Sequence, residues 1–280
     1  MKKKLKKSID FASKGTMFTI LIGWALTTIY PMFWVVMNSF KTSNEIITNS
    51  FNLPTSLNLQ NYVRALEEQV LSGYVNSFII SGTVVVFTVV IGSLAGYIMG
   101  RFQFKFKKLI QSLVLGSLLI PVFATILPVF ELLLNNGLVD THVGLILPQI
   151  AGNLPFAIMV LSSFMETIPK EMEEAAVVEG ATTFQIFMRV IAPITKPAIA
   201  TTAIFAFLWS YNDLFSSLII MRTKDKMPVN VLLTEISSQY GTDYGLMAAV
   251  IIIIVIPVLV FYAVAQNQIV EGMTAGAVKG

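Results

Sequence analysis

Six long apolar runs dominate the pattern of hydrophobic and polar positions along the chain. They cover residues 17–38, 77–100, 109–130, 143–165, 198–221 and 246–265. The hydrocarbon core of a bilayer is about 30 Å thick and takes about 20 helical residues to cross, so each run is long enough for one span. The pattern therefore predicts an all-α, polytopic membrane protein with six transmembrane helices.

Glycine and proline add detail to these predicted helices. In the second run, Gly92, Gly96 and Gly100 recur in steps of four, a stripe that lets a neighbouring helix pack closely. A proline removes a backbone donor and kinks a helix, and within a membrane the freed carbonyl must be satisfied by neighbouring protein or by a water-filled path. We expect such kinks at Pro121, Pro128, Pro148, Pro155 and Pro257.

The polar segments set the orientation. Residues 1–16 are basic, and the apolar run that follows them is too long for a signal peptide, which predicts a retained first helix behind a cytoplasmic basic segment. Residues 40–76 form the longest polar connection, in which NLQNYVRALEEQ predicts a short helix across the outer face. The positive-inside rule then places both termini in the cytoplasm. Of the 19 lysines and arginines, only Lys41, Arg64, Arg222, Lys224 and Lys226 fall outside.

Composition agrees with a membrane protein and narrows the chemistry. The 280 residues are 55% hydrophobic and 12% charged, so the apolar groups cannot all lie inside one soluble core. Without cysteine the chain has no disulfide or thiolate chemistry, and its one histidine, His142, is expected to be solvated rather than a metal ligand. No GxxxxGK[ST] phosphate loop and no cluster with metal spacing is present, so we expect no catalytic residue, metal or cofactor in this chain.

Residues 166–197, between the fourth and fifth runs, predict two short helices. Acidic side chains at positions 171, 173 and 174 suit the positive N-terminal end of the first helix, and Gly180 ends it. Thr182 or Thr183 can cap the second helix, and Pro193 lies near its end. By periodicity alone this segment is either a surface on which a partner can sit closely or an amphipathic linker resting on the membrane.

The spacing of small residues in this segment is more specific. The pattern consists of Glu174, Ala175, Ala176, Gly180 and Pro193. It resembles the EAA loop of ABC importer permeases, in which the last positions are Ile-x-Leu-Pro, whereas here Ala192 replaces the leucine. A second match lies in IVEGMTAGAVKG, residues 269–280, which looks like the C-terminal tail of the carbohydrate-uptake, MalG-like permeases. The resemblance covers nearly the whole chain.

This resemblance implies one of the two transmembrane subunits of a binding-protein-dependent ABC importer in a bacterial cell membrane. The implied partners are a second, MalF-like permease, a cytoplasmic ABC ATPase dimer that holds ATP and Mg, an extracytoplasmic solute-binding protein or lipoprotein, membrane lipid, and a sugar or oligosaccharide as substrate. Nucleic acid is not among them. Residues 166–197 would be the coupling loop that docks in the ATPase, and residues 269–280 would reach towards the ATPase dimer interface.

A few polar residues inside the apolar runs are candidates for a substrate path. Asp213 is the one carboxylate deep in a run, and it is either functional or a helix break or buried hydrogen-bonding group near the outer end of the span. Sugar sites combine aromatic surface with amides and hydroxyls, while each such residue taken singly is also suited to packing between helices. The candidates are Gln149, Asn153, Trp209, Tyr211, Asn212 and Asp213.

Two other classes of function remain as alternatives. A stand-alone channel or secondary carrier for a small polar solute would use residues 166–197 only as an interfacial helix, and it would transport without ATP or partners. A coupled carrier usually places several ionisable groups at mid-membrane depth. A single carboxylate, Asp213, is too few for that role. A membrane-embedded enzyme would need a catalytic set, which the sequence lacks.

Overall fold

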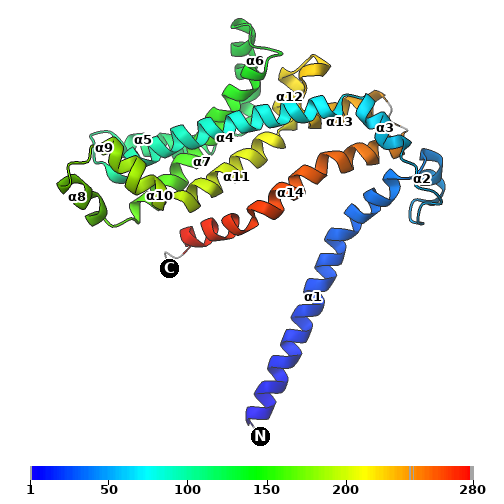
Figure 1. Ribbon diagram of the computed structural model, residues 1–280, viewed down its shortest axis with the longest axis horizontal. Coiled ribbons are helices and arrows are strands. Elements are labelled where there is room, and N and C mark those ends of the chain that lie inside the picture. Colours follow the sequence, from blue (N-terminus) through cyan, green and yellow to red (C-terminus); the bar gives the residue numbers. More distant parts are fainter. Residues whose placement is uncertain (1, 240, 242, 278–280) are drawn as a thin grey trace. The chain divides into compact units, whose positions relative to one another are not determined.

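The computed structural model describes residues 2–239, 241 and 243–277, and every regular element among them is a helix (Figure 1). The chain divides into two compact units. The first comprises Met1–Glu68 and Glu235–Ile256, and the second comprises Gln69–Thr234 and Pro257–Gly280. The prediction of an all-α protein is therefore confirmed for the described residues.

Three helices are long and apolar enough to cross a membrane. They are α1 (Lys2–Ser39, apolar from Lys14), α4 (Val70–Arg101) and α7 (His142–Glu166). Two bent pairs raise the number to five if each pair is one span. They are Lys107–Ser117 with Val122–Asn135, and Thr183–Ile194 with Lys196–Tyr211. The last helix, α14 (Tyr244–Ala277), has a shorter apolar stretch, Tyr244–Val260, among the residues whose side chains are described. A multi-pass membrane protein is confirmed, and the count of six spans remains a prediction.

Two of the predicted spans are broken rather than continuous. The run at 109–130 forms α5 (Lys107–Ser117) and α6 (Val122–Asn135), which meet at 99° just before Pro121, where the ring removes a backbone donor. The run at 198–221 forms α11 (Lys196–Tyr211) and α12 (Leu214–Ile220). Pro128, Pro148, Pro155 and Pro257 lie inside helices. Each of these two runs therefore forms two helices, and a single membrane crossing for each run remains a prediction.

The predicted tail at residues 269–280 lies only partly within the described residues. Helix α14 continues to Ala277, so the first part of this segment is helical backbone. Residues 278–280 lie outside the described residues.

The glycine stripe on α4 packs against α7, as predicted. A Cβ atom added to Gly92 would lie 2.9 Å from Ala157 Cβ, and one added to Gly96 would lie 3.0 Å from Leu161 Cβ. At Gly100 the added atom would lie 2.9 Å from the carbonyl oxygen of Ser162. Real Cβ atoms essentially never come closer than 3.0 Å to a neighbour and rarely come as close as 3.0 Å, so glycine lets the two backbones meet closely here.

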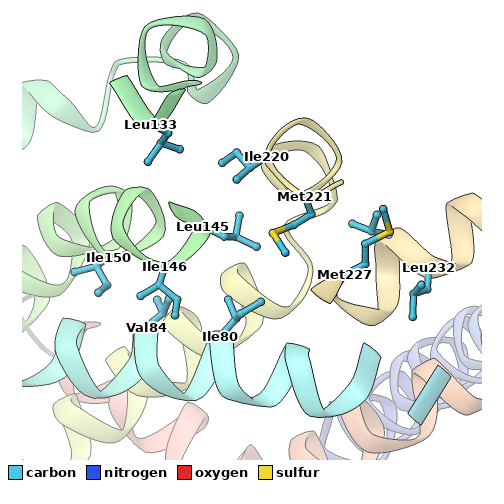
Figure 2. Packing of buried hydrophobic residues seen from close by; sticks show 11 residues of the cluster. Ile80, Val84, Leu133, Leu145, Ile146, Ile150, Ile220, Met221, Met227 and Leu232 are labelled. Atoms are coloured by element: carbon cyan, nitrogen blue, oxygen red, sulfur yellow. The ribbon is translucent and has the colours of Figure 1, made fainter. Parts of the chain in front are cut away.

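Two apolar clusters hold the second unit together. Figure 2 shows the first, in which α4, α6, α7, α12 and α13 (Val229–Gln239) contribute buried side chains. Its members are Ile80, Val84, Leu133, Leu145, Ile146, Ile150, Ile220, Met221, Met227, Val231 and Leu232. The second cluster joins Tyr97 of α4 and Leu161 of α7 to Ile186, Phe187 and Ile191 of the predicted coupling loop. The loop therefore packs on the ends of two spans.

Polar contacts organise the first unit around Asp243. Its carboxylate accepts hydrogen bonds from Ser43 Oγ at 2.9 Å, from the Leu246 N–H at 3.1 Å and from the Arg64 guanidinium at 2.5 Å. Arg64 lies on α3 (Gln60–Glu67), the short helix predicted in the polar connection, and Ser43 begins α2 (Ser43–Asn49). Lys41, counted from sequence as an outer charge, is 1% exposed and donates to the carbonyl of Asn49 at 3.0 Å.

Candidate functional site: an intramembrane cavity and a helical loop

A cavity of about 430 Å³ lies among α7, α11, α12 and the break between α5 and α6. Four of the six residues predicted for a substrate path line it. The lining residues are Leu118, Val122, Pro148, Gln149, Gly152, Asn153, Phe156, Trp209, Ser210, Asp213 and Ser216. The cavity thus joins polar side chains from helices that lie far apart in the sequence.

Gln149 is the centre of the polar wall. Its Nε2 donates to Asp213 Oδ2 at 2.8 Å, and its Oε1 accepts from Ser210 Oγ at 2.5 Å. Asn153, one turn further along α7, donates from Nδ2 to the Gln149 carbonyl at 2.7 Å. The Asn153 side chain is 7% exposed, and within the described residues its Oδ1 has no hydrogen-bond partner. A buried acceptor without a partner is costly, so this oxygen is suited to a donor that enters the cavity.

Asp213 lies at a helix break, as one interpretation expected, and it also lines the cavity. It is the N-cap of α12, where Oδ1 accepts the Ser216 N–H at 3.1 Å. Its other oxygen bonds to Gln149 on the cavity wall. The carboxylate therefore marks the helix break and faces the cavity at the same time.

Aromatic rings complete the other side of the cavity. The ring of Phe156 lies 4.9 Å from that of Trp209, centroid to centroid, and Trp209 is 47% exposed. Two predicted path residues lie elsewhere. Tyr211 is 3% exposed and stacks on Phe207 at 5.4 Å, while Asn212 donates to the Leu208 carbonyl of its own helix. Neither is among the lining residues.

The loop between the fourth and fifth runs has the predicted two-part form. Its first helix is α8 (Glu171–Val178), and a second arm follows as α9 (Thr183–Ile186), the π-helical η1 (Phe187–Ile191) and α10 (Ala192–Ile194). Gly180 has φ +82° and donates to Val177 O, while the Ala181 N–H bonds to Ala176 O. This pair of bonds is a Schellman motif, which explains why glycine ends the helix. Thr182 caps the second arm in a capping box with Gln185.

One face of α8 is open. Glu174, Ala175 and Val178 are exposed, and Val178 is 88% exposed. Ala176 points the other way and packs against the cluster beneath the loop. Pro193, the last motif residue, lies in α10. Sequence reasoning missed Val178, although its spacing of three and four residues from Ala175 and Glu174 places it on their face.

Arg101, at the end of α4, is a second residue that sequence reasoning missed. It was counted only as a cytoplasmic charge, yet its guanidinium bonds to Glu173 of α8 at 2.9 Å.

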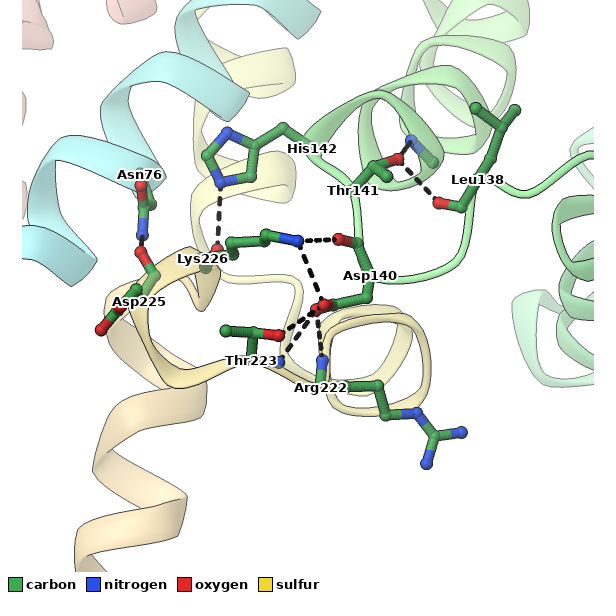
Figure 3. A network of polar contacts seen from close by, with 10 residues as sticks. Asn76, Leu138, Asp140, Thr141, His142, Arg222, Thr223, Asp225 and Lys226 are labelled. Carbon is green, nitrogen blue, oxygen red and sulfur yellow. Dashed lines mark hydrogen bonds and ion pairs between the residues drawn. The ribbon is translucent and has the colours of Figure 1, made fainter.

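Asp140 ties together two loops at the other end of α7 (Figure 3). Its carboxylate accepts the Arg222 and Thr223 N–H groups at 2.8 and 2.9 Å and the Lys226 ammonium at 3.2 Å. Burial raises the pKa of the Asp140 carboxyl, but hydrogen bonds from Thr223, Arg222 and Lys226 outweigh it and hold the pKa well below its usual range. The half-buried His142 contacts the Lys226 carbonyl at 3.1 Å. No metal-binding group of His, Asp and Glu was found among the described residues.

Apolar helices long enough to cross a membrane, with a cavity lined by polar and aromatic side chains, are typical of a membrane transport protein. Over residues 92–274 the chain matches the family described as "Binding-protein-dependent transport system inner membrane component". The chain belongs to this family, and it is a permease of an ABC importer rather than an enzyme.

Relatives match along almost the whole chain. The diacetylchitobiose uptake system permease protein NgcG of Streptomyces coelicolor is 35% identical and is matched over 92% of this chain and 86% of its own length. The trehalose transport system permease protein SugB of Mycobacterium tuberculosis is also 35% identical, over 94% and 95%. A crystal structure of a bacterial ABC transporter involved in alginate import shares the fold, with a TM-score of 0.78, 23% identity and coverage of 90% and 95%.

Proposed function

We propose that this chain is one of two permease subunits that import a sugar or oligosaccharide. The observation that carries the proposal is the near full-length likeness, at 35% identity, to permeases named for diacetylchitobiose and trehalose uptake. The cavity agrees with such a substrate, because sugars bind to aromatic faces and to side chains that exchange hydrogen bonds with hydroxyl groups.

The cavity at Gln149 lies on the translocation path. Amides and a carboxylate are expensive to expose to lipid, so a membrane helix turns them towards protein or towards water. Asn153 Oδ1, Gln149 and Asp213 would guide hydroxyl groups, and Trp209 would offer an apolar face to a sugar ring. Tyr211 and Asn212 support this wall from behind rather than contact substrate.

The loop at residues 166–197 is the coupling element. Glu174, Ala175 and Val178 form a small, partly apolar face that a cleft in a partner can approach closely. Gly180 and Pro193 shape the two arms of the loop. Because the loop is joined to a span at each end, a partner that moves α8 displaces the membrane helices.

The complete importer would contain a second, MalF-like permease, a cytoplasmic ABC ATPase dimer carrying ATP and Mg, and an extracytoplasmic solute-binding protein or lipoprotein. Both termini would lie in the cytoplasm, with residues 1–16 as the basic segment and residues 269–280 near the ATPase. The transmembrane domain would comprise residues 17–280 in a bacterial cell membrane. Six crossings would follow if α5 with α6, α11 with α12, and α14 each span the bilayer once, in addition to α1, α4 and α7.

The test is purification of the chain from its native membrane in mild detergent, beside an Ala175→Trp variant. Ala175 is the sharper choice because any side chain at Gly180 would strain the positive-φ backbone whether or not a partner docks. We expect an ATPase and a second permease with the wild type, and loss of the ATPase alone from Ala175→Trp. Asn136→Trp, at an exposed position in the loop before α7, is the matched control and should retain both partners.

One result would overturn the proposal. If the wild-type chain purifies alone and conducts solute in liposomes without ATP, it is a stand-alone carrier or channel.

A further inference from the structure

The end of α4 holds the entry to the coupling loop through one arginine. Arg101 is the last residue of α4, and its side chain is only 5% exposed. Its Nη1 donates to the Ile168 carbonyl at 2.7 Å and to the Met165 carbonyl at 3.2 Å. Its Nε and Nη2 donate to Glu173 Oε2 at 3.1 and 2.9 Å. One guanidinium therefore joins three elements: α4, the end of α7 and the first turn of α8.

The position of Arg101 follows from the helix packing beside it. Gly100 lets α4 approach the Ser162 carbonyl of α7, which brings the next side chain to the carbonyls that end α7. The last carbonyls of a helix have no partner within the helix, and a cation suits that negative end. Glu173 lies in the first turn of α8, where a carboxylate suits the positive end.

A second contact holds the other arm of the loop to the same helix. Tyr97, one turn before Arg101, packs its ring 5.2 Å from the ring of Phe187 in η1. Both arms of the loop are thus seated on the end of α4, although the chain connects the loop only to α7 and α11.

We propose that Arg101 is a positioning residue that locks α8 to the ends of α4 and α7, so that a partner moving α8 moves this helix pair as one body. The inference rests on the proposed coupling role of the loop. A planar guanidinium bridges a carboxylate and two carbonyls at once, which an ammonium does not reproduce. These bonds of Arg101 to Glu173 and to the two carbonyls form a clamp. Without this clamp, α8 would move with the partner while α4 and α7 would not follow it fully.

Spin labels measure this directly, since the chain has no cysteine and two can be introduced alone. In the assembled complex, labels at Ile98→Cys on α4 and Glu179→Cys after α8 should give one narrow distance population, unchanged by ATP with vanadate. Arg101→Gln should broaden this distribution or make it shift with nucleotide, while the ATPase still co-purifies. Lys108→Gln, which removes an exposed charge a few residues away, is the matched control and should behave like wild type.

Uptake of sugar per ATP hydrolysed distinguishes loss of the clamp from loss of folding. In proteoliposomes with trehalose and diacetylchitobiose as test sugars, Arg101→Gln and Glu173→Gln should each lower uptake per ATP hydrolysed by about tenfold. Removing both side chains should be no worse than removing one, because the clamp is one unit. If Arg101→Gln does not assemble, Arg101→Lys takes its place, because lysine keeps the positive charge but lacks the planar guanidinium with its several donors.

The outcomes separate this inference from the proposed function. Wild-type distances and wild-type uptake per ATP in the Arg101 variants would overturn the clamp and leave the importer intact. A wild-type chain that binds no ATPase would overturn the proposed function itself.

Discussion

At the scale of single residues, Asp213 illustrates how one side chain can serve two structural needs. It caps α12 through one oxygen and accepts the Gln149 amide through the other. Buried carboxylates in membrane helices are rare unless paired or functional, and here the pairing is visible. The role of Asp213 in transport therefore depends on whether its charge or its hydrogen-bonding shape matters.

We expect Asp213→Asn to lower uptake by less than about fivefold, because Asn is also a good N-cap and one neutral hydrogen bond is worth about 1 kcal/mol. Ala175→Trp, in contrast, should abolish uptake. Initial rates of sugar uptake in cells with matched amounts of assembled complex provide the measurement. Complete loss of uptake in an assembled Asp213→Asn complex would show instead that the carboxylate contacts the substrate.

The negative charge of Asp140 stabilises the fold. Its folded-state pKa is depressed, so its stabilising effect is present above the unfolded pKa of about 4 and is lost as the pH falls towards the folded value. Asn, like Asp, tolerates the left-handed backbone found here at φ 59°, so Asp140→Asn isolates the charge.

We therefore expect Asp140→Asn to lower the unfolding temperature of the purified chain at pH 7 by about 3 °C. The gap between the variant and the wild type should shrink as the pH falls below about 4. Thermal unfolding followed by tryptophan fluorescence from pH 7 to pH 3 checks this. A gap that does not change with pH would mean that shape rather than charge is responsible.

At the scale of elements, the pairing of α4 with α7 is the framework on which the cavity and the loop are placed. It depends on glycines that let two backbones meet, and a Cβ added at any of the three would lie 3.0 Å or less from an atom of α7. The helix ends on this framework also carry the polar contacts of Arg101, so packing and polar positioning support each other.

Gly96→Leu should destabilise this framework by about 1–3 kcal/mol, the usual cost of overpacking. Its added atoms would meet Leu161 and the backbone of Ser162. Gly82→Leu is the matched control on the same helix, because nothing lies within 4 Å of a Cβ at that position. Detergent-solubilised Gly96→Leu should aggregate at a lower temperature than the control. Equal stability of the two variants would contradict the role assigned to the stripe.

At the scale of the whole molecule, the two sides of the membrane can be assigned by charge and then tested through α7. The loop before α7 holds Asn136, and the loop after it holds Val178, both exposed. Because α7 is a single unbroken candidate span, these positions must face opposite sides whatever happens at the bent pairs. The positive-inside rule predicts that Val178 lies in the cytoplasm.

In a chain without natural cysteines, Asn136→Cys should react with an impermeant maleimide added outside intact cells, and Val178→Cys should react only after permeabilisation. Labelling followed by gel shift distinguishes the two. The reverse pattern would invert the proposed orientation and remove the loop from the reach of a cytoplasmic ATPase.

The sequence by itself determined the features that depend on local chemistry. Apolar runs predicted membrane helices, and three glycines in steps of four predicted close packing against a neighbouring helix. Gly180 with Thr182 or Thr183 predicted two short helices in the loop. These follow from hydrophobicity, from steric freedom and from capping, each of which acts within a few residues.

Only the tertiary structure decided which distant residues meet. Gln149 and Asp213 are 64 positions apart, and Arg101 and Glu173 are 72 positions apart. No periodic pattern in the sequence predicts that either pair will meet. The same is true of the 99° turn between α5 and α6 before Pro121, which is far larger than the kink predicted from the sequence. A hydrogen bond between distant residues forms only after helices dock, and docking depends on the packing of whole faces, which no local pattern contains.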